Sequence, residues 1–172
     1  MPAVPARLRT SAAAVGVPVL ACGLALAGLA TWAVSGRAGS PPRVTVTEAY
    51  VFQPLGPAQE TAAFFTLTND GGSADRLVGI TSPGTAAPPA LSEHRMTSSA
   101  AAYRQRVDSA AVPAGDGLTM TPYGIDVTVR PKGTWRPGDE VSFTLRLRYG
   151  KPLKVRAVVV RPGTGTGRRA LP

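Results

Sequence analysis

The chain has 172 residues, a length that suits one folded domain with additional terminal segments. Its formal net charge is +9, but residues 44–163 hold thirteen of the nineteen basic residues and all ten acidic ones. This central part is only mildly positive and has no basic run interleaved with aromatic residues, which argues against a nucleic-acid partner.

The first predicted element is an apolar segment near the N-terminus. No charged residue lies between Thr10 and Gly36, and this stretch is long enough to cross a bilayer as a helix. We predict a cytoplasmic n-region over residues 1–10 and a transmembrane signal-anchor over residues 11–35. Arg7 and Arg9 favour an N-terminus on the cytoplasmic side. The protein would then be a single-pass protein of the cell membrane, with the rest of the chain extracytoplasmic (periplasmic).

Two other interpretations of this segment stay open. Ala33-Val34-Ser35 is a pattern after which a signal peptidase could cleave a signal peptide, and the protein would then be secreted. The sequence V-L-A-C at residues 19–22 resembles a bacterial lipobox, which would make Cys22 a lipidation site. Because Cys22 is the only cysteine, the remainder of the chain has no disulfide and no thiolate metal site.

After a predicted linker over residues 36–43, the pattern changes to short β-type runs bounded by turn residues. In one run, Val141, Phe143, Leu145 and Leu147 alternate with polar residues, which predicts a half-buried strand. Gly150-Lys151 then fits a two-residue hairpin turn. The runs lie at 44–52, 62–69, 76–80, 124–130, 141–149 and 153–161.

Strands at this spacing, with no helix-period segment between them, predict an all-β fold, an antiparallel β-sandwich or barrel, over residues 44–161. The glycine-rich segment 162–172 is predicted to be a disordered tail.

Several strings in this part, taken together and in order, carry a resemblance to a known protein family. They are A-A-F-F-T-L-T-N-D-G-G, L-S-E-H-R-M, V-P-A-G, T-P-Y-G-I-D-V-T-V and W-R-P-G-D-E-V-S-F-T-L-R-L. Over residues 46–161 the chain resembles the periplasmic copper(I) chaperones that help to assemble the copper A centre of cytochrome oxidase. The resemblance implies a cupredoxin-like antiparallel β-sandwich of Greek-key type and copper as the bound metal.

The resemblance also implies a set of metal-ligand positions, which this chain fills only in part. His94, the only histidine, matches the first histidine of the family, and Met96 lies two residues after it. The distal methionine of the family falls at about Gln105. The second His-x-Met pair of the family falls on Asp126 and Thr128, after a Pro-Gly-Gly turn that is Pro122-Tyr123-Gly124 here.

These replacements change the chemistry of the expected site. Copper(I) prefers thioether sulfur and imidazole nitrogen, whereas Gln105, Asp126 and Thr128 offer only oxygen. His94 and Asp126 together suit copper(II) better. Met120 is a further, weaker candidate ligand, although its position also suits a gap-filling residue of the core.

We therefore expect a membrane-tethered extracytoplasmic protein similar to the copper chaperones. It would deliver copper to a partner such as cytochrome oxidase or a copper-transport protein. The alternative is a structural or interaction module of the same fold that has lost the metal. No catalytic motif is recognisable around the one histidine, so we do not expect an enzyme.

Overall fold

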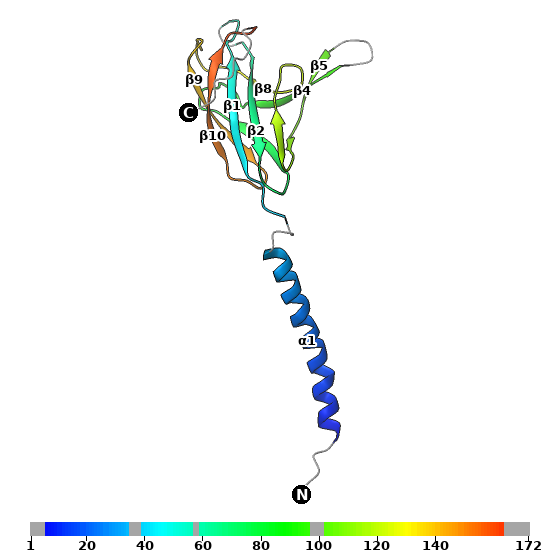
Figure 1. Cartoon of the computed structure of the whole chain (residues 1–172). Helices are drawn as coiled ribbons and strands as arrows, with labels where there is room; N and C mark the ends of the chain where they lie inside the picture. The colour runs from blue at the N-terminus through cyan, green and yellow to red at the C-terminus, as the bar shows by residue number, and fades with distance from the viewer. Residues whose placement is uncertain (1–5, 35–38, 57–58, 97–101, 164–172) are drawn as a thin grey trace. The chain divides into compact units, whose positions relative to one another are not determined.

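The computed structural model describes residues 6–34, 39–56, 59–96 and 102–163 (Figure 1). The chain divides into two compact units, residues 1–40 and residues 41–172. The predicted tail falls almost entirely on residues 164–172, which lie outside the described residues, as do residues 36–38 of the predicted linker.

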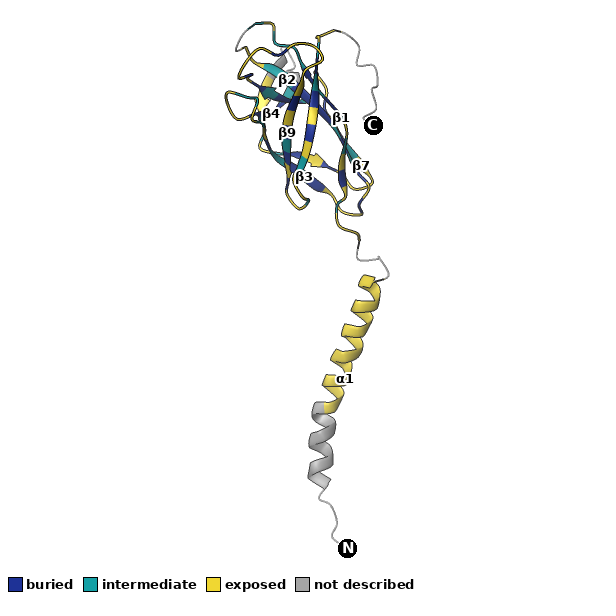
Figure 2. Cartoon of the chain, turned by 90° about the vertical axis from the view of Figure 1, so that its left-hand side faces the viewer, coloured by how far each residue is buried: buried dark blue, intermediate teal, exposed yellow. Residues whose placement is uncertain are grey.

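Within the first unit the structure describes one helix, α1 (Ala6–Val34), rich in alanine and leucine. Its described side chains, from Gly16 to Val34, are exposed along their whole length (Figure 2). By length and composition, Gly16–Val34 could cross a membrane, and a signal sequence would meet the same criteria. The predicted apolar helix is thus present, and cleavage and topology remain predictions.

The second unit is a curled β-sheet, mostly antiparallel, with the strand order β5-β4-β8-β2-β1-β10-β9-β3-β6 and with β7 paired to β2. Its strands are β1 (Val44–Phe52), β2 (Thr61–Asn69), β3 (Asp75–Thr81), β4 (Ala90–Met96), β5 (Ala102–Arg106), β6 (Ala110–Val112), β7 (Asp116–Thr119), β8 (Ile125–Val129), β9 (Glu140–Leu147) and β10 (Leu153–Val160). The all-β prediction is confirmed, with one difference: Tyr50–Phe52 of β1 pair in parallel with Val158–Val160 of β10.

The hydrophobic core forms between the two sides of the curled sheet. On β9 the four alternating apolar residues from Val141 to Leu147 are all buried, as the period-2 pattern predicts. The rings of Phe65 and Phe143 meet edge to face at 5.4 Å, and Phe64 stacks on Tyr50 at 4.9 Å. The first contact joins β2 to β9, which is distant in the sequence, and the second joins the neighbouring strands β1 and β2.

The connection between β9 and β10 corrects one local prediction. Gly150-Lys151 is not a two-residue turn, because the strands end at Leu147 and resume at Leu153. The intervening loop is organised by Asp75 of β3, which is 1% exposed and whose carboxylate accepts backbone N–H groups from the loop. Pro152 lacks an N–H, so it cannot extend the ladder with β9.

One end of the sheet holds the predicted ligand strands. β4 lies between β8 and β5, and β5 is the last strand of the order, paired only with β4 among the described strands. Figure 1 shows β4 and β5 as a hairpin that extends away from the rest of the sheet. This hairpin and β8 place the candidate site.

Candidate metal centre

His94 lies in the middle of β4, where the backbone registers fix its neighbours. It pairs with Arg104 of β5, and the preceding residue of the same face, Ser92, pairs with Asp126 of β8. The N–H of His94 also donates to the carbonyl of Gly124 at 2.9 Å. The β4–β5 hairpin and the more distant strand β8 thus bring an imidazole, a guanidinium and a carboxylate together.

The closest contact of this group joins His94 to Asp126. His94 Nε2 and Asp126 Oδ2 are 3.1 Å apart, the imidazole side chain is 25% exposed and the carboxylate side chain is 1% exposed. Two atoms that bind one first-row metal ion, each about 2.0–2.2 Å from it, lie about 3 Å apart when they subtend a near-right angle. The pair is close to this spacing, and 3.1 Å is equally the length of the hydrogen bond that the two side chains form.

A cation already lies beside this pair. Arg104 Nε is 3.4 Å from His94 Nε2, and its guanidinium approaches Asp126 Oδ2 at 3.6 Å. The guanidinium also donates to the hydroxyl of Thr128 at 3.4 Å, and that hydroxyl shares a hydrogen bond of 2.9 Å with Ser92. The group is partly open to solvent, because the Arg104 side chain is 44% exposed.

One oxygen of Asp126 has no hydrogen-bond partner among the described residues. This oxygen, Oδ1, is buried, whereas Oδ2 faces both His94 and Arg104. A buried carboxylate oxygen without a donor is costly, because it has lost its water and gained nothing in exchange. An additional hydrogen-bond donor or cation at this oxygen would therefore stabilise the buried carboxylate.

The other predicted ligands are Met96, Gln105 and Met120, and the structure does not show any of their side chains in this group. Met96 ends β4 and its backbone pairs with Ala102, but its side chain lies outside the described residues. Gln105 pairs with Glu93, so the alternation of the strand turns it to the opposite face from Arg104. Met120 is 2% exposed in the hydrophobic core, in agreement with its gap-filling interpretation.

Arg104 is the member of the group that the sequence analysis missed. Its only signal in the sequence would have been its place directly across the hairpin from His94, and that required the register of β4 and β5. Among the described residues no three His, Cys, Asp or Glu side chains lie close enough to hold a metal ion together. Any metal at His94 and Asp126 thus needs a sulfur, hydroxyl or water ligand as well.

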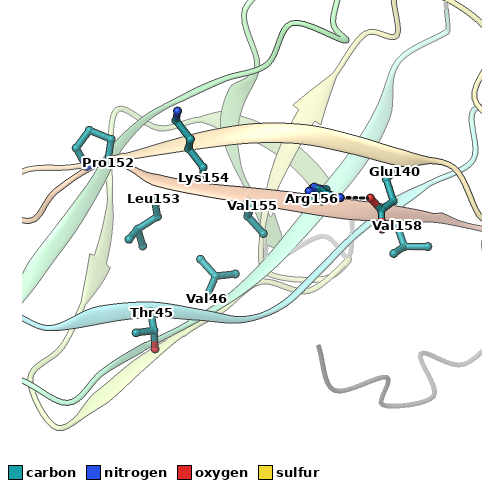
Figure 3. A pocket seen from close by; sticks show the side chains of 9 residues that line it. All are labelled: Thr45, Val46, Glu140, Pro152, Leu153, Lys154, Val155, Arg156 and Val158. Carbon is teal, nitrogen blue, oxygen red and sulfur yellow. Dashed lines mark hydrogen bonds and ion pairs between the residues drawn. The ribbon is translucent and has the colours of Figure 1, made fainter. Parts of the chain in front are cut away.

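A groove of about 630 Å³ lies elsewhere, between β1 and β10 (Figure 3). The two strands pair only near Tyr50–Phe52, and towards Val46 and Leu153 they separate. Its lining combines apolar residues with Thr45 and the charged residues Glu140, Lys154 and Arg156, and it holds no imidazole or sulfur. This groove is therefore not a candidate metal centre.

Comparisons with known proteins agree with this architecture. The solved structures that match include a copper-bound PCuAC domain from PmoF2 (17% identity, TM-score 0.57, covering 72% of this chain and 98% of that one). A Cu(I)-bound protein, DR1885 from Deinococcus radiodurans, is 29% identical with a TM-score of 0.54, over 72% of this chain and 82% of that one. The apo PCuAC domain from PmoF1 has a TM-score of 0.60 at 14% identity, over 72% and 99%.

These matches define a PCuAC-type β-domain, and the resemblance inferred from the sequence is confirmed. Residues 44–159 match the family described as "Putative lipoprotein LpqE-like". The chain belongs to this LpqE-like family. A comparison with curated protein sequences finds no match.

Proposed function

We propose that the protein is an extracytoplasmic copper-handling protein, held at the membrane by its N-terminal segment, that binds copper at His94 and Asp126. The observation that carries the proposal is the 3.1 Å approach of the only imidazole to a buried carboxylate, within a fold shared with copper-bound domains. Met96 is the expected sulfur donor, two residues along the same strand.

The donor set decides which oxidation state is held more tightly. Imidazole binds both copper ions, carboxylate suits copper(II), and a thioether suits copper(I). A site of His94, Asp126 and Met96 would hold either ion with modest affinity, which suits a protein that passes its cargo on by ligand exchange. The acceptors we propose are copper-transport proteins or the assembly of the copper A centre in cytochrome oxidase.

A competition titration tests copper binding. The full chain in detergent micelles is titrated with Cu(I) under anaerobic conditions against a colorimetric chelator, and separately with Cu(II). We expect His94→Ala to weaken binding by about tenfold or more, the loss of about 1.4 kcal/mol of binding free energy. Gln105→Ala is the matched control on the same hairpin and should bind as the wild type does. Equal binding by wild type and His94→Ala would overturn the proposal.

The second candidate is a β-sandwich module that interacts with other proteins and no longer binds metal. Arg104 favours it, because a guanidinium lies against both His94 and Asp126. A ligand that binds only the folded state raises the melting temperature by mass action. An unchanged melting temperature at a copper excess would support this module, and a clear increase that His94→Ala abolishes would exclude it.

A further inference from the structure

The guanidinium of Arg104 lies where an ion bound by His94 and Asp126 would have to approach. Its Nε is 3.4 Å from His94 Nε2 and its NH2 group is 3.6 Å from Asp126 Oδ2. Both contacts are longer than a well-formed charge-assisted hydrogen bond, which measures about 2.7–2.9 Å. Arg104 thus offsets the negative charge of Asp126 without forming a short hydrogen bond to either His94 or Asp126.

The burial of Asp126 explains why a cation is needed there in the absence of metal. The side chain is 1% exposed, and an unpaired carboxylate at that depth would be strongly destabilising. Among the described side chains, the basic ones within ion-pair distance of it are Arg104 and His94. In the metal-free domain, Arg104 therefore supplies the permanent positive charge.

The contacts at His94 Nε2 cannot all be satisfied at once. A ring nitrogen carries either a proton or a lone pair in the plane of the ring. If Nε2 is protonated it donates to Asp126 Oδ2 and faces the Nε–H of Arg104; if it is not, it accepts from Arg104 and faces a carboxylate oxygen. A metal ion would accept electron pairs from both atoms, and Asp126 Oδ1 is a further donor atom that has no partner in the described part of the chain.

We propose that Arg104 is an internal counter-cation of this site, and that copper binds only when it displaces the Arg104 guanidinium. The inference rests on the proposed function and makes Arg104 the residue that sets copper affinity. Its side chain has a route out, because it is 44% exposed and belongs to β5, the last strand of the sheet order. A rigid interior arginine could not be exchanged in this way.

Charge-removing variants of the full chain in detergent test the inference by copper competition. Arg104→Gln removes the cation, and Arg104→Lys keeps the charge. Arg106→Gln is the matched control, because it removes the same charge from an exposed residue of the same strand. We expect Arg104→Gln to bind copper about tenfold more tightly, because copper no longer has to displace a cation that lies 3.6 Å from the Asp126 carboxylate. Arg104→Lys should stay closer to the wild type, and Arg106→Gln should change affinity by less than about twofold.

The double variant His94→Ala/Arg104→Gln locates the gain. It should lose the added affinity, and a double variant that keeps it would overturn the inference, as would Arg104→Gln binding copper no better than wild type. If neither wild type nor His94→Ala binds, but Arg104→Gln does so through His94, the inference is supported and the proposed function fails. If wild type binds through His94 and Arg104→Gln gains nothing, the inference fails and the proposed function stands.

A measurement on the unmodified chain covers the case in which Arg104→Gln does not fold. The Nε–H resonance of Arg104 is followed by NMR during Cu(I) titration. Displacement should move it towards the position and fast exchange of a solvent-exposed guanidinium, whereas a resonance unaffected by saturating copper would overturn the inference.

Discussion

The Asp75 carboxylate accepts the backbone N–H of Gly150 at 2.9 Å, across 75 positions of the sequence. The same carboxylate accepts the N–H groups of Arg148 and Tyr149 at 3.1 Å and of Arg76 at 2.7 Å. One buried side chain therefore holds the loop between β9 and β10 against the start of β3. This places a structural acid at the end of the sheet that does not carry the candidate metal centre.

Asp75→Ala should destabilise the domain strongly. Several loop N–H groups lose their acceptor, and unsatisfied polar groups each cost about 1–3 kcal/mol where water cannot replace the partner. We expect a loss of about 3 kcal/mol in the free energy of unfolding, because water can reach part of the loop. Urea denaturation of residues 41–172 measures it, with the exposed Asp70→Ala as control. Equal midpoints for the two variants would contradict this role of Asp75.

Gly117 is predicted to be intolerant of any side chain. It pairs with Thr68 in the β2–β7 ladder, and a Cβ at this position would lie 2.0 Å from the carbonyl oxygen of Leu67. Gly117→Ala must therefore separate the two strands, at a cost of about 2 kcal/mol or more in unfolding free energy. Gly133→Ala, where a Cβ meets nothing within 4 Å, should change stability by less than about 0.5 kcal/mol. Thermal denaturation of both variants compares their stabilities. Similar losses of stability in the two variants would show that the approach of Leu67 to Gly117 does not exclude a side chain there.

Asp126→Asn tests the carboxylate of the candidate centre without changing its size. Loss of the anionic ligand should weaken Cu(II) binding by about tenfold, and Cu(I) binding less, because the softer ion depends more on nitrogen and sulfur. The chelator competition described for His94→Ala reports both ions. Asp108→Asn removes the same charge from an exposed residue and should leave both affinities unchanged. Unaltered Cu(II) binding in Asp126→Asn would remove this residue from the ligand set.

The state of the N-terminal segment can be read from the mass of the purified membrane-associated protein. An uncleaved signal-anchor predicts the mass of the full chain, and Cys22→Ser should remain in the membrane fraction. The description of the family as lipoproteins rests on a match to residues 44–159, which does not include Cys22. A mature chain that begins at Cys22 and carries acyl groups would establish lipidation instead. The Cys22→Ser variant would then be absent from the membrane fraction.

Helix α1 and the strands with clear alternation were predictable from the sequence, because their patterns are local. An uncharged run of this length and the period-2 burial of Val141, Phe143, Leu145 and Leu147 reflect contacts that each residue makes with a medium, membrane or core. The all-β fold and the resemblance to the copper chaperones also followed from motifs in the sequence order. The strands β4, β5, β6 and β7 did not, since they carry little alternation and depend on the strands that pair with them.

Only the tertiary structure decided what surrounds the imidazole. Arg104 rather than Gln105 lies beside His94, because a shift of one residue in strand register exchanges the two faces of β5. Asp126 is likewise buried by strands far apart in the chain, and its Oδ1 has no hydrogen-bond partner among the described residues. Asp75 accepts hydrogen bonds from three backbone N–H groups of a loop that is also distant in the sequence. Hydrogen bonds and charge compensation of this kind depend on distances in space, and a linear pattern of residue types does not contain those distances.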